Sequence, residues 1–82
     1  MPLVSLQSAR KKTVGAKQTI KAIDKGLAKR VYVAMDAETR VTDPIVALCR
    51  GKGVDVVSVD TMKNLGKACN IEVGCAVAAM LE

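Results

Sequence analysis

Three apolar runs with little polar alternation constrain this 82-residue chain more than any other feature. They span residues 31–35, 54–59 and 75–81 and are rich in Val and Ala. Runs of this kind are typical of strands covered on both faces. Helical patterns separate the runs. The sequence therefore predicts an α/β fold, a three-layer α/β/α sandwich around a mixed sheet of about four strands.

The length of the chain fits one domain, and no repeat, low-complexity tract or Pro/Gly-rich linker divides it. We expect residues 1–82 to form a single domain. A chain of this size buries about 60–65% of the surface that it exposes when unfolded. Hydrophobic residues make up 50% of the chain and Tyr32 is the only aromatic one, so Val, Ile, Leu, Ala and Met must build the core.

Helical periodicity marks the segments around these runs. Residues 3–11 predict a short first helix, and residues 13–14 predict a brief extended piece. From Ala16 onwards, apolar residues recur at steps of four, three and four, as on one buried helix face. The residues expected on that face are Ala16, Ile20, Ile23 and Leu27. Gly26 is expected to end this helix in a left-handed conformation.

Two further helices are predicted from their cap signals. An N-cap residue followed by proline starts the first, and glycine ends it. A Thr or Asp starts the second, and an Asn in the left-handed conformation ends it. The expected start and end residues are Asp43, Pro44 and Gly51 or Gly53 for the first helix, and Asp60 or Thr61 and Asn70 for the second.

The chain offers little for catalysis or metal binding. It has no His, no nucleophile elbow and no carboxylate pair spaced for one helix face. Asp36 and Glu38 fit a solvated turn at a strand end. Cys49, Cys69 and Cys75 form no Cys-x-x-Cys pair and are expected to be buried, reduced core thiols. We therefore expect no enzyme activity, no cofactor and no metal site.

The amino-terminal residues carry no targeting signal that we recognise. No basic residue precedes Arg10, and the longest apolar run there, Leu3-Val4, is too short for a signal peptide or a membrane span. We therefore expect a cytoplasmic protein without a membrane partner.

Positive charge is concentrated in one segment. Residues 10–30 carry eight basic side chains against Asp24 alone, a net charge of +7, whereas the rest of the chain sums to −2. Lys17, Lys21 and Lys25 recur every four residues and form one stripe, here called the basic stripe. Like charges at this spacing cost a few tenths of a kcal/mol per pair. This cost favours a partner that neutralises the stripe, and a solvated helix face is the open alternative.

The scarcity of aromatic residues favours structured RNA over single strands. Proteins that bind single strands usually stack bases on Phe, Tyr or Trp. At the start of the basic helix, Gly15, Ala16 and Lys17 are expected to receive a phosphate. Gln18 and Lys21 are expected to reach base edges in a groove.

A second candidate contact is the segment Ile71-Glu72-Val73-Gly74. Its two β-branched residues follow a predicted helix end and precede the last apolar run. Two interpretations stay open at this point. The segment either starts the strand, or it is exposed beside the basic helix and packs against an unstacked base.

Three motifs follow one another along nearly the whole chain: GAKQTIK at residues 15–21, VYVA at residues 31–34 and LGKACNIEVG at residues 65–74. Together they resemble the L-seven-Ae family of ribosomal and kink-turn RNA-binding proteins, specifically its small bacterial members. The resemblance implies an α/β/α sandwich. It also implies binding to kink-turns, which are sharply bent RNA duplexes with tandem sheared G·A pairs and a flipped-out nucleotide.

Carried over by motif position, the resemblance assigns roles to both segments. The residues implied near the G·A pairs and their phosphates are Gly15, Lys17, Gln18 and Lys21, and those implied around the extruded base are Ile71, Glu72 and Val73. Archaeal and eukaryotic members usually have Asn then Glu where this chain has Lys17 then Gln18. Charge-assisted bonding to guanine is therefore expected to weaken, while Lys17 adds a phosphate contact.

The sequence thus predicts a non-catalytic, monomeric, ribosomal-protein-like domain. Its expected partner is a structured RNA with tandem G·A pairs, with ribosomal RNA and ribosome association as candidates, and DNA is not expected to bind. The candidate RNA-binding residues are Gly15, Ala16, Lys17, Gln18, Lys21, Ile71, Glu72, Val73 and Gly74. A protein–protein adaptor that uses the basic face on the same fold is the alternative.

Overall fold

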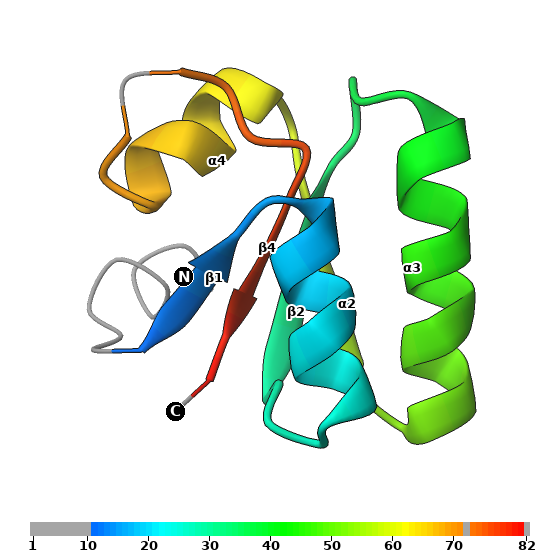
Figure 1. Ribbon diagram of the computed structural model, residues 1–82. Helices are drawn as coiled ribbons and strands as arrows, with labels where there is room; N and C mark the ends of the chain where they lie inside the picture. Colours follow the sequence, from blue (N-terminus) through cyan, green and yellow to red (C-terminus); the bar gives the residue numbers. More distant parts are fainter. Residues whose placement is uncertain (1–10, 72, 82) are drawn as a thin grey trace.

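The computed structural model describes residues 11–71 and 73–81. The elements in chain order are β1 (Lys12–Val14), α2 (Ala16–Asp24), β2 (Arg30–Ala34), α3 (Thr39–Lys52), β3 (Asp55–Val59), α4 (Met62–Ala68) and β4 (Val77–Met80) (Figure 1). Each apolar run contains a strand, as predicted, and the extended piece at residues 13–14 belongs to β1. The short helix predicted at residues 3–11 lies, except for Lys11, outside the described residues.

The strands form one mixed sheet of four strands in the order β1-β4-β2-β3. Strands β2 and β3 are parallel, and β4 is antiparallel to both β1 and β2. The parallel pair needs a crossover connection, which α3 supplies. Strand β3 lies at the sheet edge, where Asp55 and Ser58 are exposed. The two-sided coverage predicted for residues 54–59 is confirmed in part, because Val56 is half-buried against the core on one face and Val57 is half-buried against the core on the other.

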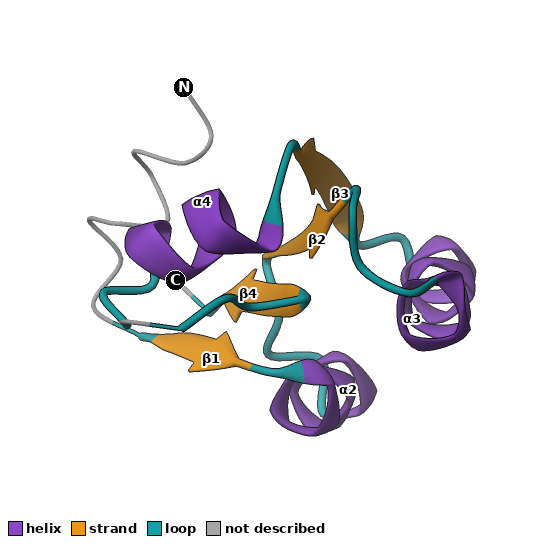
Figure 2. Cartoon of the chain, turned by 90° about the horizontal axis from the view of Figure 1, so that it is seen from above, coloured by secondary structure: helices purple, strands orange, loops and turns teal. Residues whose placement is uncertain are grey.

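Helices cover both faces of this sheet (Figure 2). On one face, α2 and α3 contribute Ile23 and Ile45 to a core with Val31 of β2. On the other face, α4 contributes Leu65 to a core with Tyr32 of β2. Neighbouring residues of β2 point to opposite faces, so a strand between two helical layers is apolar throughout. The predicted three-layer α/β/α sandwich is confirmed.

Helix α2 buries a face that only partly matches the predicted one, because Ile23 is buried and Ala16 packs against the core as predicted. Its buried residues are Thr19, Ala22 and Ile23. By contrast, Ile20 is 36% exposed and Leu27 is 53% exposed. Thr19 is fully buried because its hydroxyl forms a hydrogen bond of 3.1 Å with the hydroxyl of Thr13 in β1, which satisfies the polar group. The prediction of Ile20 and Leu27 as core residues was wrong because apolar spacing alone cannot reveal such a partner.

Each of the three described helices is followed by a left-handed residue, as predicted. Gly26 after α2 and Gly53 after α3 both have φ of 72°, and Asn70 after α4 has φ of 62°. At Gly26 the N–H groups of residues 26 and 27 return to the carbonyl oxygens of Ile23 and Ala22, at 3.0 and 2.9 Å. This pair of bonds is the Schellman pattern of a helix end.

Helix α3 begins before the predicted N-cap. It starts at Thr39 and contains Pro44, so the prediction of Asp43 as N-cap and Pro44 as the first helical residue was wrong. The carbonyl oxygen of Glu38 accepts backbone hydrogen bonds from residues 41 and 42 and thereby closes a complete turn before the proline. Thr42 is buried in line with residues 45 and 49 of the helix. Burial of this stripe extends the helix towards its N-terminus.

Within the described part of the chain, the helices are too short or too polar to cross a lipid bilayer.

Candidate nucleic-acid interface

The start of the basic helix is hydrogen bonded to the strand that follows the second segment singled out in the sequence. The N–H of Gly15, just before α2, donates a hydrogen bond of 2.9 Å to the carbonyl oxygen of Val77, the first residue of β4. Residues 71–74, here called the α4–β4 loop, lead into Cys75, so the start of α2 is attached to the strand that this loop enters (Figure 1). Glu72 lies outside the described residues.

The start of α2 is shaped by Gly15. Gly15 has φ of 98°, which L-residues rarely adopt, and a Cβ at this position would meet no other atom within 4 Å. No side chain caps α2, and its first turn contains no acidic residue. The first N–H groups of such a helix are available to an anion. The Gly15 amide itself bonds to Val77, so a phosphate at this point would use the amides of Ala16 and Lys17.

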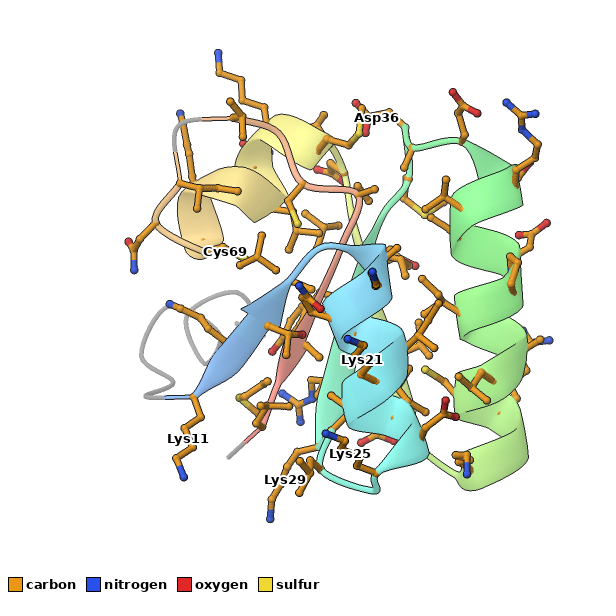
Figure 3. The ribbon with its side chains drawn as sticks, in the orientation of Figure 1. Lys11, Lys21, Lys25, Lys29, Asp36 and Cys69 are labelled. Carbon is orange, nitrogen blue, oxygen red and sulfur yellow. The ribbon has the colours of Figure 1, made fainter. Side chains whose placement is uncertain are left out.

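The basic stripe is exposed along α2. Lys17, Gln18 and Lys21 are all exposed. Ala16 is partly buried and packs against the core that α2 and α3 form with the sheet. Lys21 and Lys25 project from the same side of the helix in Figure 3. Among the residues that the structure describes, the acidic side chains form no ion pair with the basic stripe. Its charge is therefore available to an external anion.

The α4–β4 loop separates its two β-branched residues. Val73 is 70% exposed, while Ile71 is partly buried and packs against the core under α4. The N–H of Ile71 donates a 3.0 Å hydrogen bond to Gly66, and the N–H of Cys75 donates one of 3.0 Å to Met62. Both ends of the loop are thus attached to the backbone of α4. Of the two apolar side chains, Val73 is the one open to a partner.

Two glycines allow the loop to approach α4 closely. A Cβ on Gly66 would overlap the carbonyl oxygen of Val73, and a Cβ on Gly74 would lie 3.1 Å from the Cβ of Met62. Gly74, a predicted contact residue, therefore packs against α4. Gly66 was not among the predicted site residues. Its signal in the sequence was a glycine inside a helical pattern, which indicates close packing.

Asp36 connects a different loop to the start of α4. Its Oδ1 accepts a 2.8 Å hydrogen bond from the N–H of Met62, although the two residues lie 26 positions apart (Asp36 is labelled in Figure 3). Thr61 Oγ1 accepts a 3.1 Å bond from the N–H of Asn64, which confirms Thr61 as the cap. The solvated-turn interpretation of Asp36 missed its bond because long-range pairing is invisible in local sequence. Glu38, by contrast, forms an exposed ion pair with a neighbouring arginine.

The three cysteines are free and buried, as predicted. Burial raises the pKa of the Cys49 thiol. The Cys75 side chain, together with burial, raises the pKa of Cys69, and the Cys69 side chain lowers the pKa of Cys75. No cluster of three or more metal-ligating side chains occurs in residues 11–71 and 73–81.

The family model of the ribosomal protein L7Ae/L30e/S12e/Gadd45 family matches residues 3–82. The chain belongs to this family. It is 47% identical over 68 residues to a Bacillus pumilus protein named RNA-binding protein, covering 83% of each chain. It is 49% identical over 69 residues to RNA-binding protein TTE2299 of Caldanaerobacter subterraneus, covering 84% of each. The family resemblance seen in the three motifs is therefore confirmed.

Two solved structures share the fold described above. The Giardia lamblia 15.5kD RNA binding protein has a TM-score of 0.87 and 28% identity, covering 98% of this chain and 68% of that chain. A Bacillus halodurans protein of unknown function has a TM-score of 0.85 and 22% identity, covering 98% of this chain and 80% of that chain. The second likeness shows a common fold.

Proposed function

We propose that this family member is a non-catalytic RNA-binding protein that recognises a kink-turn, a bent duplex with tandem G·A pairs. The observation that carries the proposal is the attachment of Gly15 to Val77, which joins the open start of α2 to the strand that follows the loop with the exposed Val73. Relatives from Bacillus pumilus and Caldanaerobacter that carry the name RNA-binding protein support RNA as the partner.

The start of α2 supplies the polar half of the proposed contact. The amides of Ala16 and Lys17 hold a phosphate, assisted by the partial positive charge at the helix start and by the ammonium group of Lys17. Gln18 and Lys21 lie on the exposed surface of the same helix and contact base edges of the G·A pairs. Gln18 offers an amide oxygen and an amide NH₂ group, so it can accept from guanine and donate to a base acceptor.

The α4–β4 loop supplies the apolar half. Val73, which is 70% exposed, covers the face of the extruded base together with the backbone at Gly74. Ile71 packs against the core under α4 and holds the loop in position, without touching the base itself. Glu72 completes the loop between them in this proposal. Tyr32 is fully buried and is not part of the contact.

A gel-shift series with two RNAs tests the proposal. One RNA is a kink-turn, and the other is the same duplex with both G·A pairs replaced by Watson–Crick pairs. We expect the replacement to weaken binding at least about tenfold, which corresponds to roughly 1.4 kcal/mol. Lys21→Ala should weaken binding to the kink-turn, whereas Arg50→Ala, in the last turn of α3, serves as the matched control.

The possible outcomes separate the candidate functions. Equal affinity for the two RNAs contradicts kink-turn recognition and leaves general binding to structured RNA. Failure to bind either RNA favours the protein–protein adaptor that uses the basic stripe. Retained RNAs from a pull-down, identified by sequencing, then test whether ribosomal RNA is the natural partner and whether the protein is ribosome-associated in the cytoplasm.

A further inference from the structure

Strand β3 is an open edge of the sheet. It comes last in the order β1-β4-β2-β3, and its neighbour among the described strands is β2 (Figure 2). The carbonyl oxygen of Val59 accepts a 2.7 Å hydrogen bond from the N–H of Met35, the residue that follows β2. The backbone of Val59 therefore faces β2, and so does that of Val57, because the backbone groups of successive residues face opposite sides of a strand. The N–H and C=O groups of Val56 and Ser58 consequently face outward.

These outward groups are available to a further strand. In residues 11–71 and 73–81, the backbone hydrogen bonds outside the helices and the sheet involve neither Val56 nor Ser58. Natural proteins usually block such an edge with Lys, with Pro or with a β-bulge. The sequence of β3, DVVSV, contains neither Lys nor Pro, and its register with β2 runs without a bulge from Asp55 to Val59. The edge is therefore open to strand addition.

A groove runs along this edge between β3 and α3. It has a volume of about 580 Å³, and residues of β2, β3 and α3 line it. Val46 of α3 and Val56 of β3 are half-buried in its apolar part, while Asp43, Arg50 and Ser58 supply polar groups. Every second side chain of a strand added to β3 points towards this side of the sheet. The groove therefore suits apolar side chains at alternate positions.

Acidic side chains stand at both ends of the edge. Asp55 begins β3 and Asp60 directly follows it, and both are exposed. Among the described residues, neither carboxylate forms an ion pair. Residues 36–60 carry five acidic side chains against three basic ones, a net charge of −2, in contrast to the +7 of residues 10–30. The charge along this edge therefore complements a basic partner.

The same charges disfavour a second copy of the chain. When two β3 strands pair antiparallel about a twofold axis, the start of each strand lies beside the end of the other. Asp55 of each copy then lies near Asp60 of the other, at both ends of the pair. Like charges in such positions destabilise strand pairing, whereas opposite charges stabilise it. A basic segment from another protein is therefore the better occupant.

We propose that β3 is an interaction surface that binds an extended, basic segment of another protein as a fifth strand. Its apolar side chains enter the groove beside Val56, and its backbone pairs with Val56 and Ser58. The basic side chains between them point to the other face, where Asp55 lies on the same side as Val57, which packs against the core under α4. In the sheet, β4 and β2 separate β3 from β1, which precedes the start of α2. The proposal is therefore independent of RNA binding.

Peptide binding to the whole chain tests the chemistry of the partner. The probe is a fluorescent synthetic peptide that alternates Val and Lys, and anisotropy measures its Kd. Peptides that alternate Val with Glu, or Gly with Lys, remove the positive charge or the apolar side chains. Each should bind at least about tenfold more weakly than the probe. No binding of the probe, or equal binding of the Gly–Lys peptide, would overturn the proposal.

Hydrogen exchange of individual amides locates the contact. With the probe bound, the amides of Val56 and Ser58 should exchange at least about tenfold more slowly than in the free chain. The amide of Val57 faces β2 and should be protected in both states. A probe N-methylated along the edge that pairs with β3 should lose its affinity, since it cannot donate the backbone bonds. Protection confined to other elements, or full affinity of the methylated probe, contradicts strand addition.

Two variants separate charge from backbone pairing. Asp55→Lys should weaken probe binding at least about fivefold. Asp24→Lys makes the same change of charge at the end of α2 and is the matched control, which should keep the affinity of the parent chain. Ser58→Pro removes an outward N–H, leaves the bonds to β2, and should also weaken binding. If Ser58→Pro does not fold, the methylated probe tests the same bonds on the parent chain. Equal losses in the Asp55 and Asp24 variants would reduce the effect to net charge and overturn the proposal.

Discussion

The carbonyl oxygen of Val73 lies where a side chain on Gly66 would have to be. Gly66 is buried in α4, and Val73 is 70% exposed in the α4–β4 loop. The position of the exposed valine therefore depends on the absence of a side chain in a neighbouring helix. This close approach joins the packing of α4 to the surface proposed to cover an extruded base.

Gly66→Ala tests this relationship. The added methyl group forces the Val73 backbone to move, so we expect a loss of about 1–3 kcal/mol in the free energy of unfolding, together with weaker kink-turn binding. Gly51→Ala is the matched control, because Gly51 is also helical but has open space around its Cβ position. That control should gain about 0.5–1 kcal/mol, as expected for alanine in place of a helical glycine. Urea denaturation measures both, and equal effects would contradict the packing argument.

Val73→Ser and Ile71→Ser separate recognition from support. The exposed Val73 should tolerate serine with a change of no more than about 0.5 kcal/mol in stability, while kink-turn affinity falls. Ile71 packs against the core under α4, so its replacement should cost more, roughly 0.5–3 kcal/mol. Thermal melts and binding isotherms on the same variants measure both effects. Undiminished affinity per folded Val73→Ser molecule would mean that the loop is structural only.

Lys25 caps the C-terminal end of α2 and Lys29 directly precedes β2, and both are expected to contact phosphates without reading sequence (Figure 3). Removing one phosphate contact with Lys25→Ala or Lys29→Ala should reduce the slope of log K against log salt by roughly 0.7–0.9 in magnitude. Different RNAs should weaken about equally. The same measurement applies to Arg30 of β2, and Arg50→Ala again serves as the control. An unchanged slope in all three variants would show that these three side chains contact solvent and not phosphate.

Thr61→Ala should lower the free energy of unfolding by about 0.5–2 kcal/mol. The side chain of Thr61 accepts the N–H of Asn64 and caps α4, which carries both Gly66 and the attachment of the loop. Thr61→Ser keeps the hydroxyl and should remain close to the parent protein. Chemical denaturation of both variants checks this, and a similar loss in serine and alanine would show that the hydroxyl is not responsible.

The local signals of the chain predicted much of the fold. Strand β2 is buried from Val31 to Ala34, and burial on both faces requires the uninterrupted apolar run that identified it. Gly26 was identified as a helix end because left-handed backbone favours a residue without a Cβ. The cap signal of Asp43 and Pro44 led to a wrong start for α3. Thr42 is buried on the same helix face as later residues, and this burial outweighs the local preference of Asp43 and Pro44 for a helix start.

The sequence by itself determined which segments become strands, where the helices end, where positive charge gathers and to which family the chain belongs. These properties are carried by each residue and its near neighbours. Tertiary structure alone decided that α2 buries Thr19, because the partner of its hydroxyl is Thr13 in β1. It also decided that Gly15 meets Val77, a contact that requires β4 to enter the sheet beside β1. Burial and long-range hydrogen bonds depend on which elements the topology brings together, and the local sequence pattern does not specify those pairings.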